Sequence, residues 1–138
     1  MADAAEIIRM LNDDLTGEVE AILVYMHAHF VLEGHCHTQL EMLEIALDEM
    51  KHAERLSEAI VDLGGTPELR PRQLRFAPAD LKATLAHVIQ FEKDAIAQYT
   101  AHIDAIDDPK IKRLLNHIRE DEEDHLEEFE ELLEEAEE

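Results

Sequence analysis

The sequence predicts an all-α protein, a bundle of four helices arranged as two antiparallel hairpins that a long crossover segment joins. Three observations support this fold class. The chain has 138 residues with only four glycines, four prolines and no tryptophan, a composition that favours one helical domain with a modest core. Apolar residues recur at helical spacing in four segments. Three prolines interrupt the stretch between the second and third segments. We therefore expect a single domain over residues 1–138.

The first hairpin is expected from two segments with a continuous apolar stripe. The first helix should cover about residues 3–33 and stop near Gly34, and the second should cover about residues 38–63 and end at Gly64 and Gly65, because glycine commonly ends helices. Only a few residues separate the two segments, so the helices should lie antiparallel.

The second hairpin is expected from about residues 79–107 and 109–136, with Pro109 in the first turn of the last helix, where proline is well tolerated. The crossover of about residues 64–78 could extend roughly 50 Å at about 3.3 Å per residue. A helix of this length spans about 40 Å. The crossover can therefore run the length of the bundle and join the two hairpins.

Polar residues interrupt the centre of each apolar stripe, one or two per helix. They are Glu18 in the first segment, Glu49 and His52 in the second, Glu92 in the third, and Glu122 and His125 in the fourth. A buried carboxylate without a partner costs several kcal/mol. Four of them in one small core therefore require positive charge among them.

These six residues should meet at one height near the middle of the bundle. The i, i+3 spacing of Glu49 with His52 and of Glu122 with His125 places a carboxylate and an imidazole on one helix face. Four carboxylates and two imidazoles suit two metal ions, with iron or manganese the most natural. The alternative is a polar core, or accidental glutamates in a Glu-rich chain.

Two sequence motifs each occur twice along the chain. EVEAILVY and EKDAIAQY share the pattern E-x-x-A-I-x-x-Y, with Glu18 and Glu92 at their heads, and D-E-x-x-H ends at His52 and again at His125. The spacing between copies is 74 residues from Glu18 to Glu92 and 73 from Glu49 to Glu122. We expect the hairpins to be copies related by an approximate two-fold axis, each supplying half of a two-metal site.

A second apolar stripe occurs on the first two helices only. It contains Leu43, Leu47, Met50 and Val61 on the second helix and Val19, Leu23, Met26 and Phe30 on the first. The last two helices turn mostly charged residues outward. Two-sided apolarity confined to one hairpin predicts a homodimer interface made by the first two helices.

Charge and composition exclude several classes of partner and location. With 34 acidic and 12 basic residues the formal net charge is −22, which argues against nucleic acid because phosphate binding needs clustered Lys and Arg. No apolar run approaches the roughly 18 residues of a membrane span. The start of the chain lacks the layout of a signal peptide. The single Cys36 cannot form an internal disulfide, so a cytoplasmic location is the expectation.

The sequence resembles the bacterioferritins. The resemblance rests on L-N-x-x-L-x-x-E-x-x-A-I-x-x-Y (11–25), LDEMKHAERL (47–56) and DEEDH (121–125). It implies a ferritin-like bundle and a ferroxidase that oxidises Fe(II) with O₂ or H₂O₂ and stores ferric iron in an oligomeric shell. It implies two irons per subunit, one held terminally by Glu18 and His52 and the other by Glu92 and His125, with Glu49 and Glu122 bridging.

The resemblance also assigns residues outside the six ligands. Tyr25 would lie just beyond the ligands as a hydrogen-bonding or redox-active residue, whereas Tyr99 is expected to be a core tyrosine. Met50 would bind the iron of a haem-type porphyrin shared between two subunits, although packing alone could explain an interfacial methionine. A ferredoxin is the candidate electron donor.

The end of the chain departs from the resemblance. Bacterioferritins that form 24-subunit cages carry a short fifth helix, and FEELLEEAEE leaves no room for one, so we expect a shell of 12 subunits rather than 24. His27, His29, His35 and His37 cluster near Cys36, and surface histidines are the expectation there rather than a further metal or porphyrin role. Arg70, Arg72 and Arg75 in the crossover are expected to be solvated, or else paired with neighbouring subunits.

Two other functions compete with iron storage. One is a rubrerythrin-like peroxidase or another di-metal oxidase, but rubrerythrins usually add a rubredoxin domain with paired C-x-x-C motifs, which one cysteine cannot supply. A non-catalytic acidic helical bundle that binds partner proteins would retain no metal.

Overall fold

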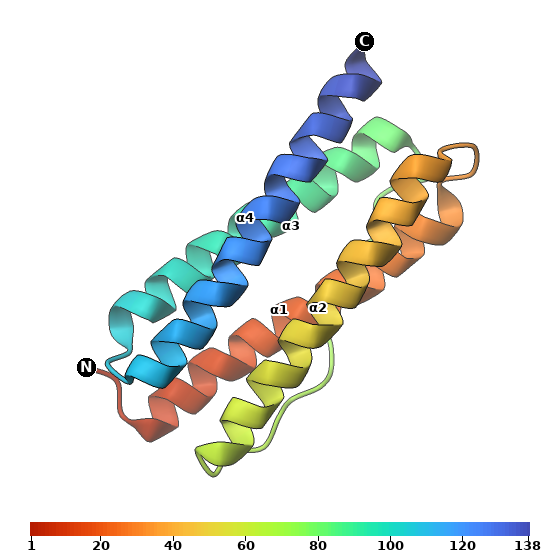
Figure 1. Cartoon of the computed structure of the whole chain (residues 1–138). Helices are drawn as coiled ribbons and strands as arrows, with labels where there is room; N and C mark the ends of the chain where they lie inside the picture. Colours follow the sequence, from red (N-terminus) through yellow and green to blue (C-terminus); the bar gives the residue numbers. More distant parts are fainter.

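The computed structural model describes all residues 1–138 and contains four α-helices. They are α1 (Ala4–Val31), α2 (Cys36–Asp62), α3 (Leu81–Ala105) and α4 (Pro109–Glu137), and together they form a four-helix bundle (Figure 1). The predicted all-α fold class is confirmed. None of the helices combines the length and the apolar character that crossing a membrane would require.

Aspartate side chains begin three of the helices. Asp3, Asp80 and Asp108 each accept a hydrogen bond from a backbone N–H of the first turn, which satisfies a donor that has no partner within the helix. Because Asp80 is the cap, α3 begins at Leu81 rather than near residue 79. The first helix ends at Val31, and the chain reverses through Gly34, whose φ of 84° is readily adopted only by glycine.

The helices pack as two hairpins, α1 with α2 and α3 with α4, and the bundle closes through contacts of α1 with α3 and of α2 with α4. In Figure 1, α2 and α4 lie in front and α1 and α3 lie behind them. The crossover between α2 and α3 is fastened to α1: Asn12 donates to the Thr66 carbonyl and accepts from the Glu68 N–H. These bonds fix the course of a segment that has no regular structure of its own.

The core consists of two apolar clusters, one toward each end of the bundle. One cluster includes Val24, Met42, Leu85 and Phe129, and the other includes Leu11, Leu56, Ile103 and Leu115. The glutamates and histidines predicted to interrupt the stripes are buried as well, and they occupy the middle of the helices between these clusters. The core therefore contains a polar layer with apolar packing on both sides.

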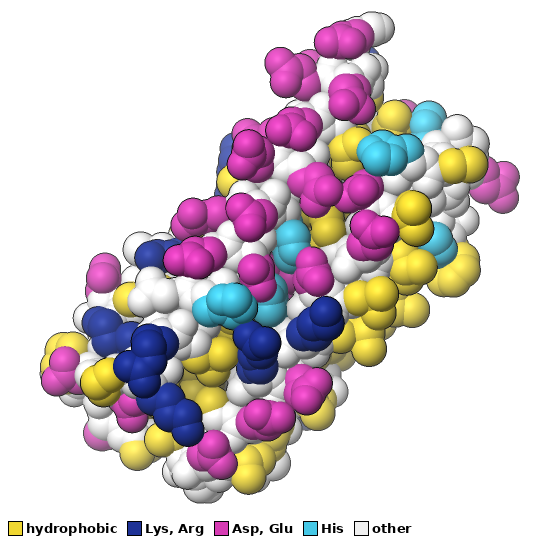
Figure 2. All heavy atoms as spheres, in the orientation of Figure 1, with side chains coloured by type: hydrophobic (Ala, Val, Ile, Leu, Met, Phe, Trp, Pro, Cys, Tyr) yellow, Lys and Arg dark blue, Asp and Glu magenta, His cyan; other side chains and the backbone are white.

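Large apolar side chains are exposed mainly along the outer side of the first hairpin. Figure 2 shows hydrophobic atoms along the edge of α2, whereas acidic groups cover much of α4. The exposed apolar residues of α1 and α2 are Leu23, Met26, Phe30, Leu40, Leu47, Met50 and Val61. We call these seven residues the apolar strip.

Candidate metal centre

The six residues that interrupt the apolar stripes meet in the polar layer. Each is almost completely buried, with 0 to 4% of its surface exposed. Glu18 comes from α1, Glu49 and His52 from α2, Glu92 from α3, and Glu122 and His125 from α4. All four helices therefore contribute to one cluster, as the sequence predicts.

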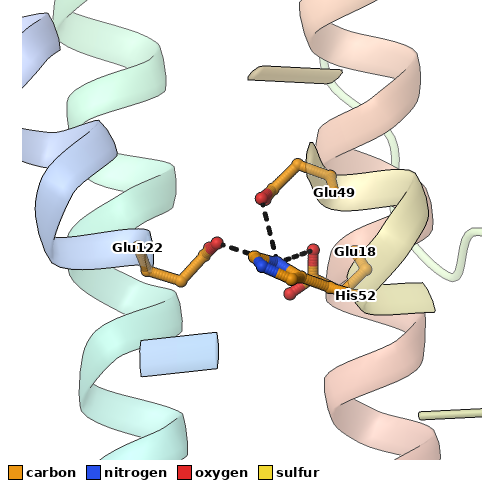
Figure 3. Close-up of side chains that lie close together, drawn as sticks. All are labelled: Glu18, Glu49, His52 and Glu122. Atoms are coloured by element: carbon orange, nitrogen blue, oxygen red, sulfur yellow. Dashed lines mark ion pairs between the residues drawn. The ribbon is translucent and has the colours of Figure 1, made fainter. Parts of the chain in front are cut away.

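The cluster divides into two overlapping groups of four. In one, ligand atoms of Glu18, Glu49, His52 and Glu122 all lie within 4.8 Å of one another; in the other, Glu49, Glu92, Glu122 and His125 do. Figure 3 shows the first group, with Glu122 reaching across from α4 to the residues of α1 and α2. Glu49 and Glu122 belong to both groups, which is the arrangement expected of carboxylates that bridge two metal ions.

Each imidazole is oriented by an aspartate of the opposite hairpin. His52 Nε2 lies 2.8 Å from Asp121 Oδ2, and His125 Nε2 lies 3.1 Å from Asp48 Oδ2. A carboxylate can only accept, so Nε2 donates in both cases. This leaves Nδ1 of each ring directed at the carboxylates: His52 Nδ1 is 3.2 Å from both Glu49 and Glu122. A carboxylate behind a histidine is the usual support of a metal-binding imidazole.

Two tyrosines support the terminal glutamates in the same reciprocal way. Tyr25 of α1 donates to Glu92 of α3 at 2.5 Å, and Tyr99 of α3 donates to Glu18 of α1 at 2.6 Å. Burial and the nearby carboxylates raise the pKa of both phenols well above the usual 10, so they stay protonated and donate. Tyr25 lies beside the cluster as predicted. Tyr99 is a core tyrosine as expected, buried in one of the apolar clusters. Its bond to Glu18 was not expected, although the repeated E-x-x-A-I-x-x-Y motif contained the signal.

Crowding of buried carboxylates shifts the protonation of the cluster. Burial raises the pKa of Glu49 well above its ordinary value and raises that of Glu92 to about 8. Burial would lower the pKa of His52 and His125, but hydrogen bonds and the attraction of the glutamates outweigh it and raise both to about 11. Metal-free, the cluster therefore holds protons in the places where a cation would give better compensation.

One atom on each of the six residues makes no hydrogen bond of good geometry, although five of the six lie 3.2 to 3.5 Å from one another in imidazole–carboxylate pairs. These atoms are Glu18 Oε2, Glu49 Oε1, His52 Nδ1, Glu92 Oε2, Glu122 Oε1 and His125 Nδ1. Buried polar atoms normally make well-formed hydrogen bonds, so six that do not, converging on one small region, fit a site that holds cations. Oxygen and imidazole donors in this number fit two divalent ions such as Fe(II) or Mn(II).

Other residues singled out in the sequence lie outside this cluster. Met50 is on the outer face of α2, half exposed within the apolar strip. Of the histidines near Cys36, His29 bonds the Gln39 carbonyl, His27 stacks on Phe76, and His35 and His37 are exposed. Arg72 is solvent-exposed as expected, and it also pairs within the chain with Asp13, at 2.5 Å.

A buried polar group beside the cluster could not be predicted from spacing. Asp14 of α1 has one oxygen 2.9 Å from Gln98 Nε2 and the other 2.9 Å from His102 Nδ1. Burial raises the pKa of Asp14, and Asp14 raises that of His102. This polar triad lies next to Tyr99 in sequence and backs the Glu18 half of the centre.

Comparison with known families gives one domain match over most of the chain: the model of the ferritin-like domain matches residues 8–138. The bacterioferritin of Desulfovibrio desulfuricans is 42% identical over 65 residues, which cover 46% of this chain and 36% of the relative. A bacterioferritin of Mycobacterium tuberculosis is 32% identical over 100 residues, which cover 68% of this chain and 57% of the relative. The chain thus spans between a third and three fifths of these two relatives.

Solved structures match over nearly the whole chain. The bacterioferritin of D. desulfuricans, described with its diiron site in different catalytic states, superposes with a TM-score of 0.90 at 28% identity, covering 95% of this chain and 80% of that one. A dodecameric thioferritin from Bacteroides fragilis, described as a bacterioferritin-related protein, gives 0.89 at 25% identity, covering 97% and 88%. The Rhodobacter capsulatus bacterioferritin, described with a haem iron and a metal-free dinuclear site, gives 0.87 at 26% identity, covering 97% and 87%.

Proposed function

Because this chain belongs to the ferritin-like family and is related to the bacterioferritins, we propose that it is a ferroxidase that oxidises Fe(II) at the six-residue centre and stores the ferric product. The observation that carries this proposal is the convergence of six donor atoms without a well-formed hydrogen bond, one from each candidate ligand. Relatives with a diiron site support it. A non-catalytic binding bundle would have no need of such a costly buried cluster.

The chain's own residues would perform three tasks in this reaction. Glu18 with His52 would hold one Fe(II) and Glu92 with His125 the other, while Glu49 and Glu122, which belong to both groups, would hold the ions close together. Each Fe(II) supplies one electron, so a pair supplies the two electrons that reduce O₂ to H₂O₂ or H₂O₂ to water. Asp48 and Asp121 would keep the imidazoles aimed at the ions, and Tyr25 and Tyr99 would fix the terminal carboxylates.

The test of ferroxidase activity is iron oxidation by metal-free protein. Two equivalents of Fe(II) per chain are added without oxygen, then O₂ or H₂O₂ is introduced and ferric absorbance is followed. We expect oxidation much faster than in buffer, and loss of that acceleration in His125→Ala with helix content unchanged. Wild-type protein that binds no Fe(II) and leaves its oxidation rate unchanged would overturn the proposal and favour the binding bundle.

We propose that the apolar strip is the interface of a homodimer made by α1 and α2. Its seven large apolar side chains are between 36% and 69% exposed in the single chain, and a self-complementary face of this kind is typical of two-fold dimers. Assembly of such dimers would build a shell around the stored mineral. We favour 12 subunits, and the dodecameric relative from B. fragilis supports this size. Light scattering of the purified protein measures it.

Met50 is the residue that would hold a haem iron between two subunits. Met50 is half exposed among the apolar side chains of the strip, a setting that fits both an axial ligand and an apolar macrocycle. The haem iron of the R. capsulatus relative supports the presence of such a group. We expect a Soret band that Met50→Leu abolishes, with Fe(II) oxidation unaffected. A Soret band that persists in Met50→Leu would remove Met50 from this role.

A further inference from the structure

A cavity of about 670 Å³ lies between α1 and α3 and reaches the metal centre. Its inner wall includes Glu18, Glu49 and Glu122 together with both tyrosines, Tyr25 and Tyr99. Neither histidine of the centre lines it. The cavity therefore approaches the centre from its carboxylate side, and not from the α2 and α4 side, where Asp121 and Asp48 bind the imidazoles.

The crossover forms part of the outer wall of this cavity. The backbone N–H groups of Arg72 and Gln73 donate to the same oxygen of Glu20, at 2.9 and 2.7 Å, and the Arg72 guanidinium binds Asp13. All four residues line the cavity. These bonds to α1 hold the rim of the cavity in place, so the opening is a defined feature of the fold.

Gly17 also lines the cavity, directly before the ligand Glu18 in the middle of α1. Its backbone has no positive φ that would demand glycine, and a Cβ built on it would meet no atom within 4 Å. A glycine inside a helix costs about 1 kcal/mol relative to alanine. Neither backbone geometry nor close packing explains this cost. What the missing side chain leaves is open space beside the metal centre.

In the Glu92 half of the centre, an aromatic side chain occupies the position equivalent to Gly17. Adding the 74-residue repeat to Gly17 gives Phe91, just as it takes Glu18 to Glu92. The Phe91 ring lies edge-on to Tyr25 and His87, with centroids 6.5 and 5.3 Å away. Two equivalent positions thus carry the smallest side chain and an aromatic ring, and both line the same cavity.

Thr16 adds an unpaired polar atom to the open half. It is only 4% exposed, it lines the cavity, and its Oγ1 has no hydrogen-bond partner. A buried hydroxyl normally pairs, so this one is available to a hydrated ion passing beside Gly17. The wall is also more acidic than basic, which favours a cation: it contains two arginines and seven acidic side chains, those of Asp13, Asp14, Glu18, Glu20, Glu49, Asp94 and Glu122.

We propose that the cavity between α1 and α3 is the path by which Fe(II) reaches the metal centre, and that Gly17 keeps this path open. The inference rests on the proposed ferroxidase function and adds to it the direction of substrate entry and the residue that controls it. A side chain at position 17 obstructs arrival of the ion without removing a ligand, so it changes the rate of binding rather than the number of ions bound.

The test is the substitution Gly17→Phe, which places at position 17 the side chain found at the equivalent position 91. Metal-free protein is mixed with Co(II), which has the charge of Fe(II), is stable to O₂ and changes its absorption on binding. We expect wild type and Gly17→Phe to bind two Co(II) per chain, with binding slowed about tenfold or more in the variant. Gly17→Ala should lie close to wild type. Ala97→Phe is the matched control, because Ala97 is exposed on α3 and does not line the cavity.

Each result decides between the path and the function. Gly17→Phe that binds two Co(II) at the wild-type rate overturns the path and leaves the ferroxidase proposal standing. Wild type that binds no Co(II) overturns the function and the path with it. Should Gly17→Phe bind fewer ions at equilibrium, Gly17→Leu and Gly17→Ala decide: rates that fall with side-chain size at full occupancy support the path, and equal rates overturn it.

Discussion

The two hairpins supply the same ligands but surround them differently. Glu18, Glu49 and His52 repeat as Glu92, Glu122 and His125, and the reciprocal bonds to tyrosine and aspartate repeat with them. Behind the Glu18 half lies Asp14, which is hydrogen-bonded to both Gln98 and His102. The equivalent positions of the other half are Val88, Val24 and Ala28, all members of one apolar cluster.

The outer faces of the two hairpins differ as well. Met50 lies in the apolar strip on α2, whereas its counterpart on α4 is the exposed Glu123. Gly17 and Phe91 make the same contrast beside the centre. The two-fold symmetry thus holds for the six candidate ligands and for the tyrosines and aspartates bonded to them. The positions around them differ, which fits the proposed access on one side and the proposed assembly on another.

The largest expected effect comes from removing a ligand that both halves share. Glu122→Ala removes a carboxylate from both groups of four, whereas Glu92→Ala removes one from a single group. We expect Glu122→Ala to bind no stable metal pair and to lower the Fe(II) oxidation rate by about 100-fold or more, beyond the effect of losing a supporting residue. Stopped-flow oxidation and metal analysis measure both quantities.

The neighbouring Glu123→Ala serves as the control, because Glu123 is exposed and faces away from the cluster. It should leave both the rate and the metal content unchanged. If Glu92→Ala and Glu122→Ala retained the same number of ions, the distinction between shared and terminal carboxylates would be wrong.

A second experiment distinguishes the two metal positions by how much each stabilises the fold when Co(II) binds. A site held at 100 times its dissociation constant stabilises the fold by about 2.7 kcal/mol. Two occupied positions should therefore raise the free energy of unfolding of the wild type about twice as much as one. His125→Gln leaves the group of Glu18, Glu49, His52 and Glu122 complete, so we expect it to keep roughly half of the stabilisation by Co(II), measured by denaturant unfolding.

His52→Gln is the mirror variant and should behave alike if the two positions are equivalent. Unequal losses would show that the polar surroundings of Glu18 and the apolar surroundings of Glu92 change metal affinity. Full stabilisation of either variant by Co(II) would contradict the assignment of the histidines as ligands.

The sequence predicts the fold class and the meeting of the six polar residues because both depend on spacing within a helix. A carboxylate that interrupts an apolar stripe must point into the core, and E-x-x-H places two donors on one face. Helix ends were less well predicted where a cap intervenes: Asp80 delays α3 to Leu81. The short loops within each hairpin also allowed us to predict that the six residues lie at the same height along the bundle.

The contacts between hairpins could not be read from spacing. The bond between Asp121 and His52 depends on the register of α2 against α4, and the bond between Tyr99 and Glu18 depends on the register of α1 against α3. Both also depend on side-chain rotamers. The attachment of Arg72 to Asp13 depends on the course of a crossover without periodicity. The repeated motif nevertheless contained Tyr99, and two-fold symmetry applied to Tyr25 would have found it.

A third prediction tests that symmetry. Tyr25→Phe and Tyr99→Phe each delete one hydroxyl that bonds a terminal glutamate and preserve the ring. Loss of such a supporting bond typically weakens metal binding by about 10- to 100-fold. We expect each variant to lower the affinity for one of the two Co(II) ions, which a titration measures. Tyr99→Phe without effect, beside a weakened Tyr25→Phe, would return Tyr99 to a packing role.

The smallest expected effect concerns the polar triad that only one half possesses. Burial alone would lower the pKa of His102, but the hydrogen bond and the attraction of Asp14 raise it above the ordinary 6.5. A raised pKa in the folded state means that folding takes up a proton, so this contribution is complete below pH 6.5 and is lost as the pH rises through the folded value. Asp14→Asn should remove it.

We therefore expect metal-free wild type to lose more stability than Asp14→Asn as the pH rises from 6.5, because only the wild type has the raised pKa of His102. Denaturant unfolding across this range measures the slope, and His37→Gln, on the exposed start of α2, controls for surface histidines. Parallel slopes for wild type and Asp14→Asn would mean that the triad carries no linked proton. The Val88 half has no titrating group in the equivalent positions, so the part of the pH dependence that Asp14→Asn removes belongs to the Glu18 half, while Glu92, with its pKa of about 8, titrates alike in wild type and variant.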